Sequence, residues 1–176
     1  MNFLLDRIGN LAARARPGTP WRDTVLELCQ TARQQDKLDG ETGRMLVEAA
    51  RLLRATHELS TEAFCYVVAW VVESEVEADI RGIYASEYEP RFKAIQNAYR
   101  LRENWEFRAG EEPPEYVALS GEFERRVAEI TTEGFRRHGE PLLAEHYERD
   151  RAGFARLRDT GRAALLGPDI GLAPVG

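Results

Sequence analysis

Apolar residues recur every three or four positions along almost the whole chain, and no stretch of five or more residues alternates cleanly between apolar and polar side chains. The first spacing places apolar side chains on one face of an α-helix, whereas strict alternation would indicate a β-strand. We therefore predict an all-α protein, folded as an antiparallel bundle of about six or seven helices.

Proline and glycine turn signals divide this pattern into separate segments. The expected helices are 3–15, one from Pro20 to a turn at Asp39-Gly40, 41–56, one from residue 61 to residue 84 or 85, 90–107, 115–138 and 141–166. We predict one helical domain over 1–166, with shorter helices in 1–58 and longer helices in 59–166. A flexible tail is expected over 167–176.

The junction near residue 86 has two interpretations. Ser86 and Glu89 match a capping box and precede Pro90, which favours a new helix that begins there. A single kinked helix that runs through Pro90 is the alternative.

The last two expected helices are the longest, and a short link at Gly139 predicts that they form an antiparallel hairpin. In the final helix a heptad seam repeats at spacings of four and three residues. Its members are Leu143, Tyr147, Asp150, Phe154, Leu157, Gly161 and Ala164. We expect Asp150, the charged member, to be partly buried and paired, with a wet surface position as the alternative. Gly134 and Gly161 permit a close approach between helices or a pocket.

The segment from Leu59 to Ile83 begins with a cap at Ser60, continues as the longest apolar run of the chain and ends in alternating acids. Glu62, Glu73 and Glu77 share one helical face, away from the valine stripe. Carboxylates inside a helical bundle bind paired metal ions when Glu-x-x-His pairs accompany them, and no such pair is present. We therefore interpret this segment as a central packing helix with an acidic outer face.

Histidines offer few candidates for chemistry. His146 and Asp150 stand one helical turn apart and could act together as a general base, but no nucleophile or oxyanion motif accompanies them. His138 follows Arg136 and Arg137 at a helix C-terminus, where positive charge complements the helix dipole. We expect no catalytic, cofactor-binding or metal-binding residues and no cofactor.

Two surface patterns concern binding. Arg125-Arg126 and Arg136-Arg137 lie three turns apart, but nearby glutamates favour a neutralised ion-pair surface over an anion site. The glutamates are Glu122, Glu129 and Glu133. Aromatic residues gather in the middle of the chain, where they indicate either core or a protein-binding surface. They are Tyr84, Tyr88, Phe92, Tyr99, Trp105 and Phe107.

Composition is that of a globular protein, with 43% hydrophobic and 31% charged residues. The longest apolar run, Ala63–Val72, has ten residues, and a membrane span needs about 20. The N-terminus lacks the features of a secretory signal. We therefore expect a soluble, cytoplasmic protein without a membrane partner, in which Cys29 and Cys65 are buried small side chains rather than a disulfide.

The net charge is −6, and residues 60–113 hold most of the excess, with eleven acidic and six basic side chains. This distribution opposes nucleic acid, which we do not expect as a partner. Our leading hypothesis is a non-enzymatic adaptor or scaffold that binds a protein partner or assembles with itself, through the C-terminal hairpin or the aromatic and acidic middle.

Two other functions stay open. The layout of short helices followed by longer ones resembles that of tetracycline-repressor-like regulators, although no motif matches. The resemblance implies a helix-turn-helix in which 41–56 is the recognition helix, carrying Arg44, Arg51 and Arg54. The third alternative is a small acid–base or metal-dependent enzyme that uses Glu73, Glu77, His146 and Asp150.

Overall fold

The computed structural model describes residues 2–35, 38, 40–99, 107–108 and 110–167, and within these ranges every regular element is helical. The elements are α1 (Asn2–Ala13), α2 (Arg22–Arg33), α3 (Gly40–Ala55), α4 (Thr61–Ile83), the π-helical segment η1 (Tyr84–Tyr88), α5 (Glu89–Ala98), α6 (Pro114–Arg137), α7 (Pro141–Arg149) and α8 (Arg151–Leu166). The prediction of an all-α bundle is confirmed. The predicted tail lies outside the described residues from 168 onward.

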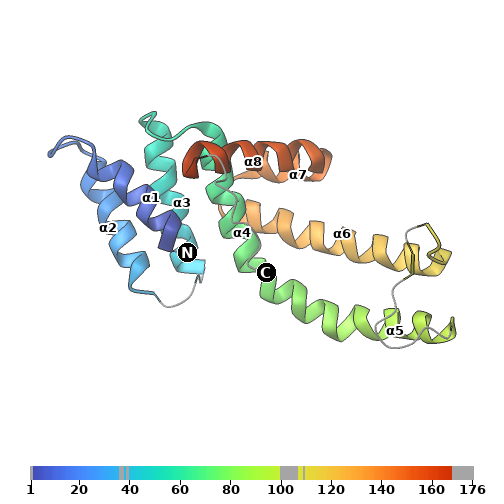
Figure 1. The fold of residues 1–176 in the computed structure, drawn as a ribbon. Coiled ribbons are helices and arrows are strands. Elements are labelled where there is room, and N and C mark those ends of the chain that lie inside the picture. Colours follow the sequence, from blue (N-terminus) through green and yellow to red (C-terminus); the bar gives the residue numbers. More distant parts are fainter. Residues whose placement is uncertain (1, 36–37, 39, 100–106, 109, 168–176) are drawn as a thin grey trace, which may run out of the picture.

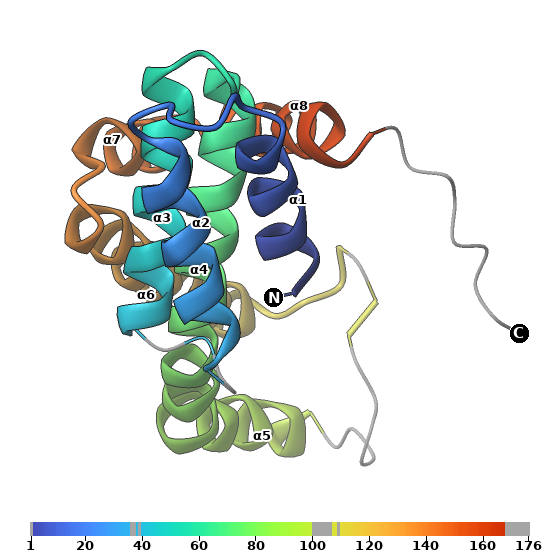
Figure 2. The same cartoon turned by 90° about the vertical axis from the view of Figure 1, so that its left-hand side faces the viewer.

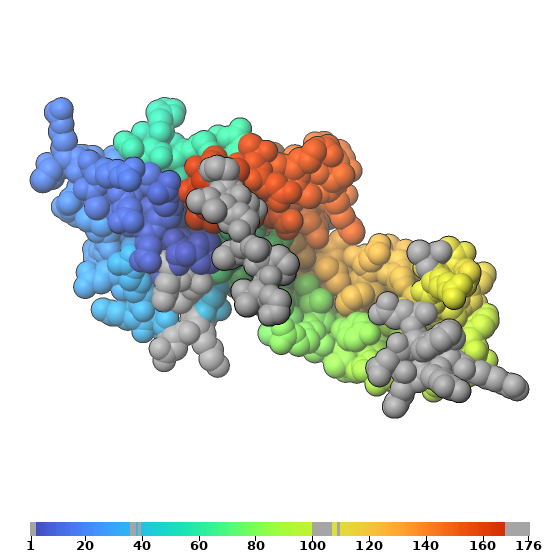
Figure 3. Space-filling model, viewed as in Figure 1, coloured from blue at the N-terminus to red at the C-terminus, as the bar shows by residue number. Residues whose placement is uncertain are grey.

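Helix α4 occupies the centre of the molecule (Figures 1 and 2). The first three helices pack together and meet α4 mainly through α3, and Phe3 of α1 adds an edge-on contact with Trp70 of α4. Helices α6 and α8 pack on other parts of α4. Beyond the body, the chain continues from α4 through η1 into α5, and α6 returns antiparallel to it. We call η1, α5 and residues 114–124 of α6 the arm, which projects from the body in Figure 3.

The central position of α4 follows from its sequence. The Ser60 side chain accepts a hydrogen bond from the Ala63 amide at 3.1 Å, as predicted for the cap. Every residue from Ala63 to Val72 except the partly exposed Trp70 is buried, because helices cover α4 on several sides. The main core adds large side chains from the other helices, including Leu4, Leu5, Ile8, Leu46, Leu53, Phe135, Phe154 and Leu165.

Two glycines allow neighbouring helices to approach α4 closely, as the sequence predicted. A Cβ atom at Gly134 of α6 would lie 2.6 Å from the Val72 side chain, and one at Gly161 of α8 would overlap the carbonyl group of Glu62. Helix α8 also covers the face of α4 that carries Tyr66, which is 6% exposed. The interpretation of this face as an acidic outer surface is therefore wrong for the part that α8 covers.

The chain passes through Pro90 without a break. Proline has no N–H to donate to the carbonyl four residues earlier, and its ring crowds that carbonyl. Just before it, the Glu89 amide donates to the Tyr84 carbonyl in the π pattern, and the helix continues. The continuous helix is confirmed, and the capping box is wrong because the Ser86 hydroxyl donates to the Gly82 carbonyl instead. Helix α5 ends at Ala98, and residues 100–106 of the predicted helix 90–107 lie outside the described residues.

The predicted helix 141–166 is two helices, and the heptad seam is wrong. Asp150 breaks the helix with φ −145° and ψ 80°, and its carboxylate accepts a hydrogen bond from the Gly153 amide at 2.8 Å as the N-cap of α8. Its side chain is exposed, and at the end of α8 Leu165 is buried instead of Ala164. The helix breaks at Asp150 although the heptad spacing continues, because an aspartate side chain accepts hydrogen bonds from the free amides at the start of a helix.

This cap can be tested by Asp150→Ala, which we expect to lower the free energy of unfolding by about 1 kcal/mol. Asp150→Asn keeps an acceptor oxygen and should have a much smaller effect. Urea unfolding followed by circular dichroism measures both. A continuous helix would respond in the opposite sense, since alanine is the better helix former, and a gain in stability with alanine would contradict the break.

Candidate functional site

The structure does not bring the predicted acid–base residues together. Glu73 of α4 accepts a hydrogen bond from Arg158 of α8 at 2.7 Å, and Glu77 pairs with Arg81 one turn along its own helix. The His146 ring packs edge-on against Phe154 with centroids 5.8 Å apart, and the Asp150 carboxylate caps α8. Each of the four residues makes a contact elsewhere in the fold. The four side chains do not form a common site that would support the enzyme alternative.

Metal and thiol chemistry have no site in the described ranges. No group of three or more histidine, cysteine, aspartate or glutamate side chains in this part of the chain could hold a metal ion. Cys29 and Cys65 are free and buried, as predicted. Burial raises the pKa of each thiol to about 11, so both stay protonated at neutral pH.

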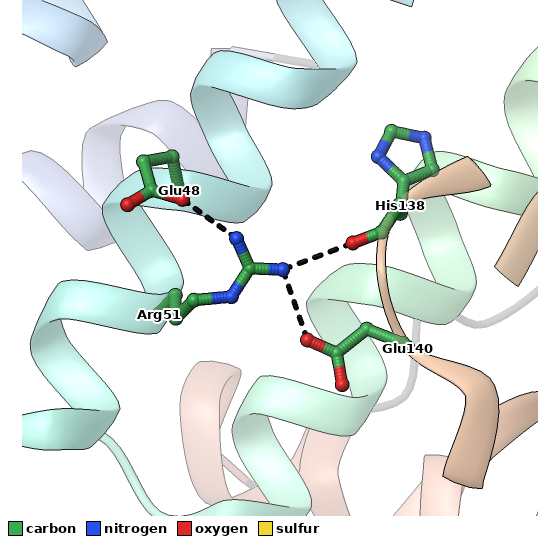
Figure 4. A network of polar contacts seen from close by, with 4 residues as sticks. All are labelled: Glu48, Arg51, His138 and Glu140. Atoms are coloured by element: carbon green, nitrogen blue, oxygen red, sulfur yellow. Dashed lines mark hydrogen bonds and ion pairs between the residues drawn. The ribbon is translucent and has the colours of Figure 1, made fainter. Parts of the chain in front are cut away.

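A buried polar junction joins α3, α4 and the end of α6, and the sequence did not predict it. The His138 Nε2 atom lies 2.8 Å from a carboxylate oxygen of Glu75, and the two side chains are 4% and 12% exposed. Arg51 donates to the His138 carbonyl and to Glu140 at 3.0 Å each, and to Glu48 at 2.6 Å (Figure 4). His138 is thus held by two helices, beyond the dipole role that the sequence suggested.

The sequence does carry a signal for Glu75. It stands four residues after Val71 and three after Val72, on the buried side of α4. Gly43 of α3 leaves room for it, since a Cβ there would overlap the second carboxylate oxygen. Burial lowers the pKa of Arg51, but its hydrogen bonds to Glu140 and Glu48 outweigh this and raise it. Glu75 and His138 form the buried part of the junction, while Glu48, Arg51 and His138 also line an open pocket. The second carboxylate oxygen of Glu75 is buried without a hydrogen-bond partner among the described residues.

The arginines of α3 make contacts within the protein. Arg44 donates to the Gly40 carbonyl at 3.1 Å, Arg51 belongs to the junction, and the Arg54 guanidinium lies 4.0 Å from the centroid of the Phe64 ring. Asp39 of the predicted turn lies outside the described residues. These contacts do not test DNA binding, and the regulator alternative stays a prediction.

The arm holds a second apolar cluster, separate from the main core. Tyr88, Phe92 and Leu119 are buried in it, and the partly buried members are Ile83, Ile95, Tyr116 and Phe123. Its rings contact one another in a row: the centroid distances are 5.4 Å for Tyr84–Phe123, 4.9 Å for Tyr88–Phe123 and 5.0 Å for Phe92–Tyr116. A pair of helices buries only the faces turned toward each other, so this cluster is incompletely covered.

An open groove runs along the exposed side of this cluster. We call it the aromatic groove; it is lined by Tyr84, Glu89, Phe92, Lys93, Gln96, Tyr116, Ser120, Phe123 and Glu124. Tyr84 is 38% exposed at the groove. Val117 elsewhere on the arm is 56% exposed, and Tyr99, directly after α5, is 49% exposed. Tyr88 and Phe92 are core, as one of the two interpretations predicted, and Tyr84 is exposed. The interpretation as a protein-binding surface stays a prediction. Trp105 lies outside the described residues.

Two ion pairs lie on the surface of the arm. Arg91 of α5 donates two hydrogen bonds of 2.8 Å to the Glu122 carboxylate of α6, and these bonds lower the pKa of Glu122. Lys93 pairs with Glu89 at 2.8 Å. No ion pair within the described ranges reaches Glu87 or Glu124, both exposed. Of these two, only Glu124 lines the groove, so the described groove lining holds one carboxylate without an ion pair.

The arginine pairs of α6 form ion pairs in part, as predicted. Arg126 contacts Glu129 at 3.2 Å, and Arg136 contacts Glu133 at 4.0 Å and Glu148 of α7 at 3.3 Å. These exposed pairs contribute little to stability.

Comparisons with known proteins supply no relative, so the functional proposal rests on the geometry of this structure. No protein-family model, curated protein or solved structure matches this chain. Of the helices that the structure describes, none has the length and apolar character needed to cross a membrane. The aromatic groove is the candidate site, because it combines apolar rings, exposure and charge.

Proposed function

We propose that this chain is a non-enzymatic protein that binds a segment of a partner protein in the aromatic groove of its arm. The observation that carries this proposal is the incompletely covered second cluster, in which Tyr84 is 38% exposed beside buried Phe92. Aromatic side chains are enriched at protein interfaces, where they supply much of the binding energy. A groove between two helices suits an apolar helix face or an extended segment.

The surroundings of the groove support a preformed site. The Arg91–Glu122 pair joins α5 to α6 beside it, and the row of ring contacts limits side-chain motion. A site that is ordered before binding loses less conformational entropy when the partner binds. The buried junction at Glu75 and His138 lies on the body and does not line this groove.

Site-specific photocrosslinking in the native host tests the proposal. A photoreactive residue in place of Lys93, which lines the groove, should crosslink a defined partner, and Tyr84→Ser in the same chain should abolish the crosslink. The control probe replaces Leu142 of α7, which is 77% exposed and outside the groove. Equal crosslinking from both probes, or a crosslink that survives Tyr84→Ser, would contradict binding in the groove.

A further inference from the structure

The arm concentrates the negative charge of the protein. Its residues, 84–98 and 114–124, contain five acidic and two basic side chains, an excess of three acids, compared with an excess of six for the whole chain. At the groove itself, Glu89 and Glu124 stand against one cation, Lys93, which is already paired with Glu89. A segment that enters the groove therefore meets a negative rim.

The walls of the groove attract cations as well. The faces of aromatic rings have a negative electrostatic potential and attract guanidinium and ammonium groups within about 6 Å of the ring centroid. The protein uses the same contact on its own arm, where the Arg91 guanidinium lies 5.5 Å from the Tyr88 ring centroid. Tyr84, Phe92, Tyr116 and Phe123 offer further rings to a ligand in the groove.

From these two observations we infer that the partner segment is basic, and that its arginine or lysine side chains pack on the groove rings between Glu89 and Glu124. Such a side chain places its aliphatic stem on apolar surface and its charge near the carboxylates. An acidic segment meets repulsion at the same rim, so the charge selects among partners of similar apolar pattern. This inference rests on the proposed function and names the partner class.

Three fluorescent model peptides test the inference with the full chain. They share the apolar positions of an amphipathic helix, and their polar positions are all arginine, all glutamine or all glutamate. By fluorescence anisotropy, the arginine peptide should bind about tenfold more tightly than the glutamine peptide. The reason is that the binding free energies of several arginine contacts with the groove rings and carboxylates add together. Its affinity should fall as salt rises, and the glutamate peptide should not bind.

Variants assign the preference to the groove. The double variant Glu89→Gln/Glu124→Gln should weaken the arginine peptide about fivefold and leave the glutamine peptide unchanged. Tyr84→Ser should weaken both peptides. The matched control is Glu27→Gln/Glu58→Gln, which makes the same charge change at exposed positions of the body and should change neither affinity.

Three outcomes would overturn the inference. Equal binding of the arginine and glutamine peptides leaves the groove as a protein-binding site but removes the basic partner. The second is that the unmodified protein binds none of the peptides. A dimer of the unmodified protein in native mass spectrometry, dissolved by Glu89→Gln/Glu124→Gln, would assign the groove to a second copy instead. The photocrosslinking experiment tests the proposed function independently of these peptide measurements.

Discussion

Gly161→Ala should lower the free energy of unfolding by about 2–3 kcal/mol, because the new methyl group has no space. A Cβ on Gly161 would overlap the backbone carbonyl of Glu62 and lie 3.0 Å from the Tyr66 Cβ atom. The carbonyl belongs to α4 at the centre of the fold, so relief requires that α8 move away as a whole. This separation would open the main core next to Leu165, which is 2% exposed.

Gly82→Ala is the matched control for this substitution. Gly82 is also helical, but no atom lies within 4 Å of a Cβ built there. Alanine should therefore raise stability by about 0.5–1 kcal/mol through helix propensity alone. Urea unfolding of both variants gives the comparison. If Gly161→Ala were as stable as Gly82→Ala, the close approach of α8 to α4 would be refuted.

Glu75→Ala should lower the free energy of unfolding by about 2 kcal/mol, because it leaves the buried His138 side chain without its hydrogen-bond partner. His138 is 4% exposed at its side chain and lies 2.8 Å from Glu75. Glu77→Ala is the control on the same helix: the Glu77 side chain is 66% exposed and pairs with Arg81. Removal of such a surface pair changes stability by about 0.5 kcal/mol or less.

A double-mutant cycle separates the pair from its surroundings. If Glu75 and His138 stabilise the fold through each other, Glu75→Ala/His138→Ala should cost clearly less than the sum of the two single variants. Chemical denaturation of the four proteins supplies the coupling energy. Additive losses would show that the two residues act independently and would contradict the junction.

The sequence predicted the helices well, but not all of their interruptions. The cap at Ser60 and the expected range 41–56 agree closely with α4 and with α3, Gly40–Ala55, because both depend on local spacing and on turn residues. The single helix 141–166 failed at Asp150. Asp150 stands at the spacing of a heptad position, and its side chain is also of a type that caps the start of a helix. The spacing alone does not decide which of the two roles applies.

The candidate site was less accessible to sequence reasoning. The aromatic residues of the middle were identified, together with both of their interpretations. Periodicity tells which side chains share a helical face, but a face becomes core or surface only when another helix covers it. Tyr88 and Tyr84 stand one turn apart, and their burial differs because α6 returns over one and leaves the other at the groove.

The sequence by itself determined an all-helical chain with α4 as its apolar centre, because the spacing of apolar residues and the capping side chains act within a few residues of each other. The tertiary structure alone decided which glutamate is buried. Glu73 and Glu77 looked most notable in the sequence, yet Glu75 contacts His138, the residue directly after α6, inside the fold. The tertiary structure also decided that the aromatic residues of the arm line a groove with a negative rim. This groove depends on how α5 packs against α6, and the two helices are separated in the sequence.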